Sequence, residues 1–276
     1  HTAHAKGMGD PVMVASLTAV DGEVGRILAT LETRGLREMT NILIVSDHGF
    51  ATYGGEQDGT LADPAGMLIE NGLKESADST DVVEVHGAIY VNEGGAERVK
   101  AIVHALQEQP WTGPLFTRAG LPGTLSFDLI RFDHERAPDI MFSPRWTDAV
   151  NEYGYAGYTM APGIAGHGSA SRHEVRATLI AAGPDIRQGR ENPLPTANVD
   201  VAPTVAHLLG IENAEFPHGR VMKELLNDGP DPDREEIIHE GAIVSAPLAG
   251  GGEFKLFAHT SRVGEYKYFD YATVME

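Results

Sequence analysis

The chain has 276 residues, enough to bury a sizeable core, and this length fits one large α/β domain with an insertion or two smaller domains. Aspartate and glutamate outnumber lysine and arginine by 40 to 21, and the formal net charge of −19 argues against a polymeric nucleic acid as partner. Cysteine is absent, which excludes disulfides and thiolate metal sites, so any metal must be held by His, Asp or Glu.

The sequence contains no recognisable targeting signal. No apolar run approaches membrane-spanning length, and no signal-peptide pattern is present. Residues 1–11 contain no start methionine, charged leader or apolar stretch, and we therefore expect the N-terminus to be truncated. The sequence is compatible with a cytoplasmic, periplasmic or secreted protein and with any oligomeric state.

A long helix is predicted near the N-terminus. Asp10 and Pro11 form a start signal, an N-cap followed by proline at the first helical position. Apolar residues then recur at helical spacing through about Thr33, and Gly35 is a C-terminal stop. We expect this amphipathic helix to pack on a sheet.

The next stretch, 41–50 (NILIVSDHGF), is an aliphatic run that ends at polar residues. The unbroken run 42–45 predicts a strand buried on both faces in a parallel sheet. Asp47 and His48 follow its carboxyl end, where open α/β sheets bind ligands, and they offer an oxygen and a nitrogen donor to zinc. A loop with a turn-capping Asp and an incidental His is the alternative. The order of helix and strand favours an α/β fold with a doubly wound, mostly parallel sheet flanked by helices.

Residues 82–161 are predicted to form an inserted α+β cap subdomain. Within this block the pattern indicates strands and one helix: strand 82–91, helix 96–106, and strands 114–118, 124–132 and 137–142. His86 and His104 are interpreted as ordinary strand and helix residues. We expect the cap to contribute to substrate choice, because insertions between sheet elements commonly shape a pocket.

A glycine-flanked histidine follows the loop 153–164. Gly166 and Gly168 on either side of His167 would let backbone and imidazole approach a metal closely, although a mobile loop residue is the alternative. The loop leads into a buried strand predicted at 177–182.

The remainder of the chain is predicted to contain two helices and then strands. A helix at 200–209 carries His207, interpreted as structural, and a second helix is expected at 218–226. An acidic segment at 228–236 marks a boundary. The expected organisation is a metal-binding α/β core, the cap and a C-terminal β extension: residues 1–81 with 162–228, 82–161, and 229–276.

Four short blocks together carry a family resemblance: Thr2-Ala3-His4 with Gly7, Ser46-Asp47-His48-Gly49, Gly166-His167-Gly168-Ser169, and Asp200-Val201-Ala202-Pro203-Thr204 with Leu208-Leu209-Gly210. In this order and spacing, across residues 1 to about 227, the chain resembles the alkaline phosphatase superfamily. Within it, the resemblance is to the nucleotide pyrophosphatase and type I phosphodiesterase branch.

The resemblance implies a hydrolase with two divalent metal ions, zinc in the first place, that bind and polarise a phosphoryl group. Carried over by position, His4 and His167 would serve one metal, and Asp47 and His48 the other. The implied substrate is a small phosphorylated molecule, such as a nucleotide or a phosphodiester. The same resemblance implies phosphodiester or pyrophosphate hydrolysis.

The chain also departs from the family pattern. An Asp expected four residues before His4 would precede His1 and is absent, and the Thr or Ser nucleophile would also lie upstream. We therefore expect no catalytic nucleophile within the chain and no activity from it alone. Ser46 and Ser169 are weaker candidates for that role.

Other interpretations stay open at this point. The polypeptide could be a non-catalytic metal-binding fragment, or belong to a phosphomonoesterase, sulfatase, phosphonoacetate hydrolase or phosphomutase branch. A copper site at the N-terminal amine and ring of His1, completed by His4, is a further alternative.

Overall fold

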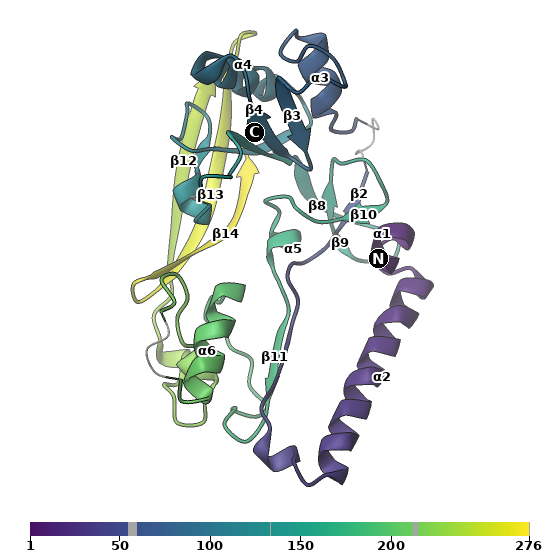
Figure 1. Cartoon of the computed structure of the whole chain (residues 1–276), viewed down its shortest axis with the longest axis vertical. Helices are drawn as coiled ribbons and strands as arrows, with labels where there is room; N and C mark the ends of the chain where they lie inside the picture. The colour runs from purple at the N-terminus through teal and green to yellow at the C-terminus, as the bar shows by residue number, and fades with distance from the viewer. Residues whose placement is uncertain (55–59, 133, 212–214, 276) are drawn as a thin grey trace.

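The computed structural model describes residues 1–54, 60–132, 134–211 and 215–275 (Figure 1). These residues combine helices with several β-sheets, which confirms the α/β class. None of the helices in these ranges has the length and apolar character needed to cross a membrane.

The elements alternate along the chain. The α-helices are α1 (Thr2–Lys6), α2 (Pro11–Thr33), α3 (Pro64–Glu70), α4 (Gly95–Gln107), α5 (Arg172–Val175) and α6 (Val201–Leu208). The 3₁₀-helices are η1 (Arg37–Met39), η2 (Phe127–Ile130), η3 (Asn198–Asp200), η4 (Lys223–Leu225) and η5 (Pro232–Arg234). The strands are β1 (Ile42–Val45), β2 (Ala51–Tyr53), β3 (Val82–Val85), β4 (Ala88–Val91), β5 (Thr112–Thr117), β6 (Leu125–Ser126), β7 (Ile140–Pro144), β8 (Trp146–Val150), β9 (Ala156–Thr159), β10 (Ala165–Gly166), β11 (Leu179–Ala182), β12 (Ile238–Pro247), β13 (Glu253–Val263) and β14 (Tyr266–Val274).

Strand β1 forms where the aliphatic run predicts it, but its neighbour differs from the expectation. It pairs antiparallel with β11, from Ile42 opposite Ala182 to Val45 opposite Leu179. Val45 keeps 45% of its surface exposed. The expected parallel pairing and two-sided burial of β1 are therefore wrong for the described residues, because β11 runs in the opposite direction and covers one edge only.

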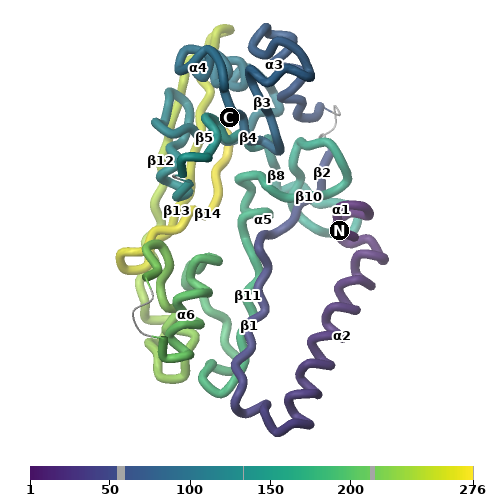
Figure 2. Tube along the Cα trace, viewed as in Figure 1, coloured from purple at the N-terminus to yellow at the C-terminus, as the bar shows by residue number. Residues whose placement is uncertain are grey.

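Helix α2 begins at the predicted cap. The Asp10 side chain accepts a hydrogen bond from the Val12 amide at 2.7 Å, and Pro11 takes the first helical position. No residue of α2 is buried, and Leu17 and Val20 are each at least 60% exposed. The expected packing of its apolar face on a sheet does not occur within the described chain. In Figures 1 and 2, α2 lies on one side of β1 and β11, and α6 lies on the other.

Residues 82–91 form a hairpin instead of the single predicted strand. β3 and β4 pair antiparallel around His86 and Gly87, whose φ angles are 50° and 83°. Two successive positive φ values define the type I′ turn, whose twist matches that of the flanking strands. His86 is thus a turn residue and not the strand residue expected from the sequence.

Two further predicted elements are largely replaced by tighter structure. The expected strand 124–132 is a two-residue β6 followed by η2, and the chain leaves η2 at Arg131 with φ of 52°. The helix expected at 218–226 is reduced to η4. The reason is that the amides of Arg220 and Met222 donate to the side chains of Asp200 and Thr204, which removes them from helical hydrogen bonding.

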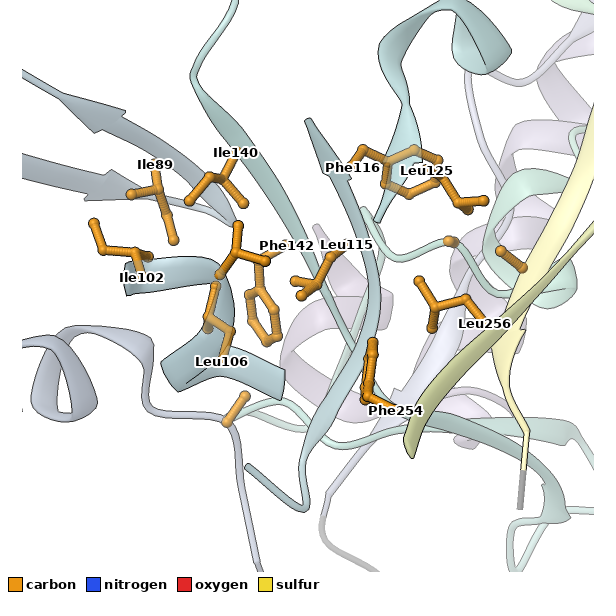
Figure 3. Packing of buried hydrophobic residues seen from close by; sticks show 14 of the residues in the cluster. Ile89, Ile102, Leu106, Leu115, Phe116, Leu125, Ile140, Phe142, Phe254 and Leu256 are labelled. Atoms are coloured by element: carbon orange, nitrogen blue, oxygen red, sulfur yellow. The ribbon is translucent and has the colours of Figure 1, made fainter. Parts of the chain in front are cut away.

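The main hydrophobic core lies between a five-stranded sheet and the C-terminal strands (Figure 3). The five-stranded sheet has the order β3-β4-β7-β5-β6, and α4 packs against it through Ile102 and Leu106. The antiparallel sheet β12-β13-β14 confirms the expected C-terminal β structure and adds Phe254 and Leu256 to the same core. By contrast, β8 and β9 join β2 and β10 in a second sheet. The boundaries of core, cap and extension remain a prediction.

A buried polar network joins the C-terminal strands to the start of α6. Asp200 is fully buried and accepts hydrogen bonds from the Arg220 amide at 2.8 Å and the Tyr268 hydroxyl at 3.0 Å. The Arg220 guanidinium donates to Tyr268 and forms a bidentate ion pair with Glu224. Burial acts to lower the pKa of Arg220, but hydrogen bonding and the charge of Glu224 together raise it above its ordinary value.

Replacing Leu115, which is fully buried in β5, by alanine should lower the free energy of unfolding by about 2–5 kcal/mol. The loss combines missing apolar burial with a cavity that the surrounding side chains fill only in part. Denaturant unfolding measures it. The matched control is Leu209→Ala, because Leu209 is 68% exposed and its truncation leaves no cavity. Equal losses in the two variants would contradict the core described above.

Replacing Tyr268 by phenylalanine should cost about 1–3 kcal/mol of stability, because it leaves buried polar groups of Asp200 and Arg220 without their hydroxyl partner. The melting temperature of Tyr268→Phe is compared with that of Tyr266→Phe. Tyr266 is the first residue of β14 and is partly exposed, so its hydroxyl is the matched control. A stability loss as large in the control would show that the network is not the cause.

Candidate metal centre

The histidine rings predicted to bind metal lie together although their positions are far apart in the sequence. His4 belongs to α1, His48 follows β1, and His167 follows β10. The ring centroids of His4 and His167 are 5.2 Å apart, and those of His48 and His167 are 3.5 Å apart. The Asp47 carboxylate lies 3.5 Å from Nε2 of His48. The chain thus brings the four candidate ligands into one cluster.

Two of the rings are oriented by backbone carbonyls. Nδ1 of His4 lies 3.0 Å from the carbonyl oxygen of Ala165, and Nδ1 of His48 lies 2.7 Å from that of Gly49. A carbonyl only accepts, so each Nδ1 is the donor, and in the neutral ring Nε2 keeps a free lone pair. Metal-ligating histidines commonly show this arrangement, in which the second nitrogen is fixed by an oxygen acceptor.

The electrostatic surroundings of His167 favour its neutral form. Burial lowers the pKa of its ring, and the neighbouring rings of His48 and His4 lower it further, whereas the Asp47 carboxylate acts in the opposite direction. Only a neutral imidazole has a nitrogen lone pair available for a metal. The environment therefore suits His167 to coordination.

Phe50 also belongs to this cluster, although it was not predicted from the sequence. Its ring lies 4.8 Å from His4, 5.6 Å from His167 and 6.1 Å from His48, measured between centroids. It follows His48 by two residues, so the signal was an aromatic residue at the end of the predicted ligand loop. Phe50 therefore gives all three histidines an apolar neighbour.

The loop that carries His167 is fixed from both sides. The Tyr53 hydroxyl donates to the His167 carbonyl at 2.8 Å. The buried Glu174 carboxylate accepts hydrogen bonds from the Ser169 amide at 2.7 Å and from the Thr159 hydroxyl. Burial, and after it the charge of Glu174, raise the pKa of Tyr53. The hydroxyl therefore stays protonated and remains a donor.

Glycines are required where this loop and its neighbour pass close to other atoms. A Cβ on Gly166 would lie 2.4 Å from the Tyr53 ring, and one on Gly49 would lie 2.2 Å from the His173 carbonyl oxygen. Both distances are too short for any side chain. The glycines beside the candidate ligands are thus explained by close packing as well as by access to a metal.

The two serines considered as nucleophiles already have hydrogen-bond roles. The Ser46 hydroxyl accepts from the Thr178 amide at 2.7 Å, and that of Ser169 accepts from the Ser171 amide at 3.1 Å. The Ser46 hydroxyl ties its loop to the segment just before β11, and the Ser169 hydroxyl supports the backbone of its own loop. This use favours a structural function for both.

The donor chemistry fits zinc, but the described side chains do not form a complete coordination set. Nitrogen and carboxylate oxygen are the ligands that zinc takes in the absence of cysteine. Within the described ranges, no group of three or more His, Asp or Glu side chains converges on one point. The rings of His48 and His167 are stacked face to face with an interplanar angle of 17°, so they are not directed at a shared centre. The assignment of pairs of ligands to individual metals remains a prediction.

Three further histidines considered in the sequence have other places in the fold. His86 forms the β3–β4 turn, and His104 on α4 faces Glu108 at 3.9 Å. His207 lies in the last turn of α6.

Comparison with known proteins identifies the family. Residues 1–164, more than half of the 276-residue chain, match the family described as type I phosphodiesterase / nucleotide pyrophosphatase. The chain belongs to this family. The membership confirms the resemblance to the alkaline phosphatase superfamily that the four sequence blocks carry.

The chain is also similar to individual proteins of known sequence or structure. Alkaline phosphatase PhoD of Zymomonas mobilis is 26% identical over 241 residues, which cover 75% of this chain and 40% of the relative. Murine ectonucleotide pyrophosphatase/phosphodiesterase 5 has a TM-score of 0.57 at 18% identity, over 82% of this chain and 56% of that structure. The human protein gives 0.56 at 20% identity, again over 82% and 56%. These structures show a shared fold, and this chain spans between 40% and 56% of the proteins compared.

Replacing Glu174 by glutamine should loosen the His167 loop, because the amide group replaces one of the two carboxylate oxygens that accept from Ser169 and Thr159. We expect the Ser169 amide to exchange with deuterium about tenfold faster, as measured by hydrogen exchange. Glu253→Gln, on an exposed strand end, is the control. Unchanged exchange at Ser169 would show that Glu174 does not hold the loop.

Proposed function

We propose that this chain is part of the catalytic domain of a hydrolase that cleaves phosphodiester or pyrophosphate bonds in small phosphorylated substrates. The observation that carries the proposal is the gathering of His4 on α1 with His48, His167 and the Asp47 carboxylate from two separate loops. Family membership supports the same class of reaction. A complex of an inactive form of murine ectonucleotide pyrophosphatase/phosphodiesterase 5 with AMP supports a substrate of nucleotide size.

In this proposal His4 and His167 hold one divalent metal ion, and Asp47 and His48 hold a second, with zinc as the first candidate. When bound, the two ions would supply positive charge for the phosphoryl oxygens and for the attacking and leaving groups. Such charge is needed because the chain itself carries a net charge of −19, which would otherwise repel an anionic substrate. Further ligands are required to complete both sites, since the described residues form no set of three.

The residues of this chain would orient the site and give its histidines an apolar neighbour. The carbonyls of Ala165 and Gly49 keep the Nδ1 protons of His4 and His48 in place, which leaves Nε2 for metal. Phe50 is that apolar neighbour. We propose that the nucleophile is a Thr or Ser upstream of His1, because both serines near the cluster support backbone amides.

A second candidate is phosphomonoester hydrolysis. The name of the relative from Zymomonas mobilis, alkaline phosphatase PhoD, favours it. The two activities share the donor cluster and differ in how many substituents the phosphoryl group carries. The proposed cap, residues 82–161, would shape that choice.

The metal site is tested by replacing His48 and His167 individually with alanine in the protein extended upstream of His1. Each variant should lose at least about a hundredfold in kcat/KM on a nitrophenyl phosphodiester. Loss of a residue that only supports a metal ligand typically costs about 10–100-fold, and loss of the ligand itself should cost more. His104→Ala is the control, because His104 lies on α4 outside the cluster. Retained activity in both variants would overturn the proposed site.

Metal removal and substrate range complete the test. Dialysis against a chelator should abolish turnover, and added zinc should restore it. Parallel assays on a nitrophenyl phosphodiester, a phosphomonoester and a sulfate ester decide between the two candidates. Residues 1–276 alone should be inactive at saturating zinc, and turnover comparable to that of the extended protein would require a nucleophile or a metal-bound water within this chain.

A further inference from the structure

Asn198 makes a contact with the candidate ligand loop that the proposed function does not use. Its Nδ2 atom donates to the carbonyl oxygen of Ser46 at 3.1 Å and to that of Asp47 at 2.9 Å. Ser46 and Asp47 lie just after β1, 152 and 151 positions before Asn198 in the sequence. This is a long-range connection to the backbone of a proposed metal ligand.

The chemistry of the contact is specific for an amide side chain. Nδ2 carries two N–H groups, and the two carbonyl oxygens are acceptors only, so one group can serve each. An aspartate of the same shape would place lone pairs against lone pairs at both contacts. The bonds fix the direction of the chain between Ser46 and Asp47, and hence the direction in which the Asp47 carboxylate leaves the backbone.

The segment that carries Asn198 is itself firmly held. Asp200, two residues further along η3, is fully buried and accepts from the Ala197 amide at 2.9 Å as well as from Arg220 and Tyr268. Asn198 therefore extends from an anchored turn, while Asp47 keeps 87% of its side chain exposed. Asn198 and Val45 line a cavity of about 900 Å³ that reaches this turn.

We propose that Asn198 is a positioning residue that orients Asp47 for metal binding. The inference rests on the proposed function, since it takes Asp47 as a ligand. The Asn198 side chain contacts only the backbone of the proposed ligand Asp47. Its proposed role therefore involves no direct contact with metal or substrate. Supporting groups of this kind change metal affinity by about 10–100-fold when removed.

The test uses Asn198→Ala and Asn198→Asp in the protein extended upstream of His1. Zinc affinity is measured by competition with a chromophoric chelator, and kcat and KM are measured separately on a nitrophenyl phosphodiester. Both variants should bind zinc about 10–100-fold more weakly and lose kcat at subsaturating zinc, with little change in KM. Asn227→Ala is the matched control, because its Nδ2 also donates to a distant backbone carbonyl, that of Pro184 at 2.7 Å.

Thermal unfolding separates positioning from general stability. With chelator present, the Asn198 variants should melt close to the unaltered protein, and the difference should appear only when zinc is added. An equal drop under both conditions, with unchanged zinc affinity, would overturn the inference.

His48→Ala, measured alongside, distinguishes the two levels of the argument. If it loses zinc binding while the Asn198 variants bind zinc normally, the positioning role is wrong and the proposed function stands. If His48→Ala also binds zinc normally, both are overturned.

Discussion

The arrangement of the candidate site depends on α5, a helix of a single turn that joins the two loops carrying His48 and His167. Its backbone carbonyls at His173 and Glu174 accept hydrogen bonds from the amides of Phe50 and Gly49, at 3.0 and 2.7 Å. The Glu174 carboxylate accepts from Ser169 in the other loop. A buried carboxylate with fixed donors is strongly directional, so this turn fixes the backbones of the two loops relative to each other.

The sequence predicted those features that depend on neighbouring residues. Asp10 with Pro11 identifies the start of α2, the aliphatic run identifies β1, and the glycine-flanked His167 identifies the third loop, because caps, burial and tight turns each have a local signature. It could not predict Glu174 or Asn198, whose roles come from partners placed by the fold. Phe50 stands two residues after the predicted ligand His48, but its contacts with His4 and His167 depend on segments that only the fold brings together.

Partner choice is also where the predicted fold differs from the observed one. An apolar run indicates a buried strand, but it does not determine which strand pairs with it or in which direction. In the structure, β1 pairs with the antiparallel strand β11. The same limit applies to α2, whose apolar spacing is real while its face stays exposed in the described chain. The turn at His86 differs in kind, because a glycine that ends a two-residue break between two apolar runs is a local hairpin signal.

The last strand has a consequence for how the protein can be shortened. The Ala272 amide donates to the Ala170 carbonyl at 3.0 Å, within three residues of His167, while Tyr268 reaches Asp200 two residues from Asn198. Both turns that flank the candidate site thus form hydrogen bonds with β14, which lies more than 60 residues further along the chain. A chain that stops before residue 266 would lose both hydrogen bonds at once, so β14 contributes to the order of the two turns although it is remote in sequence.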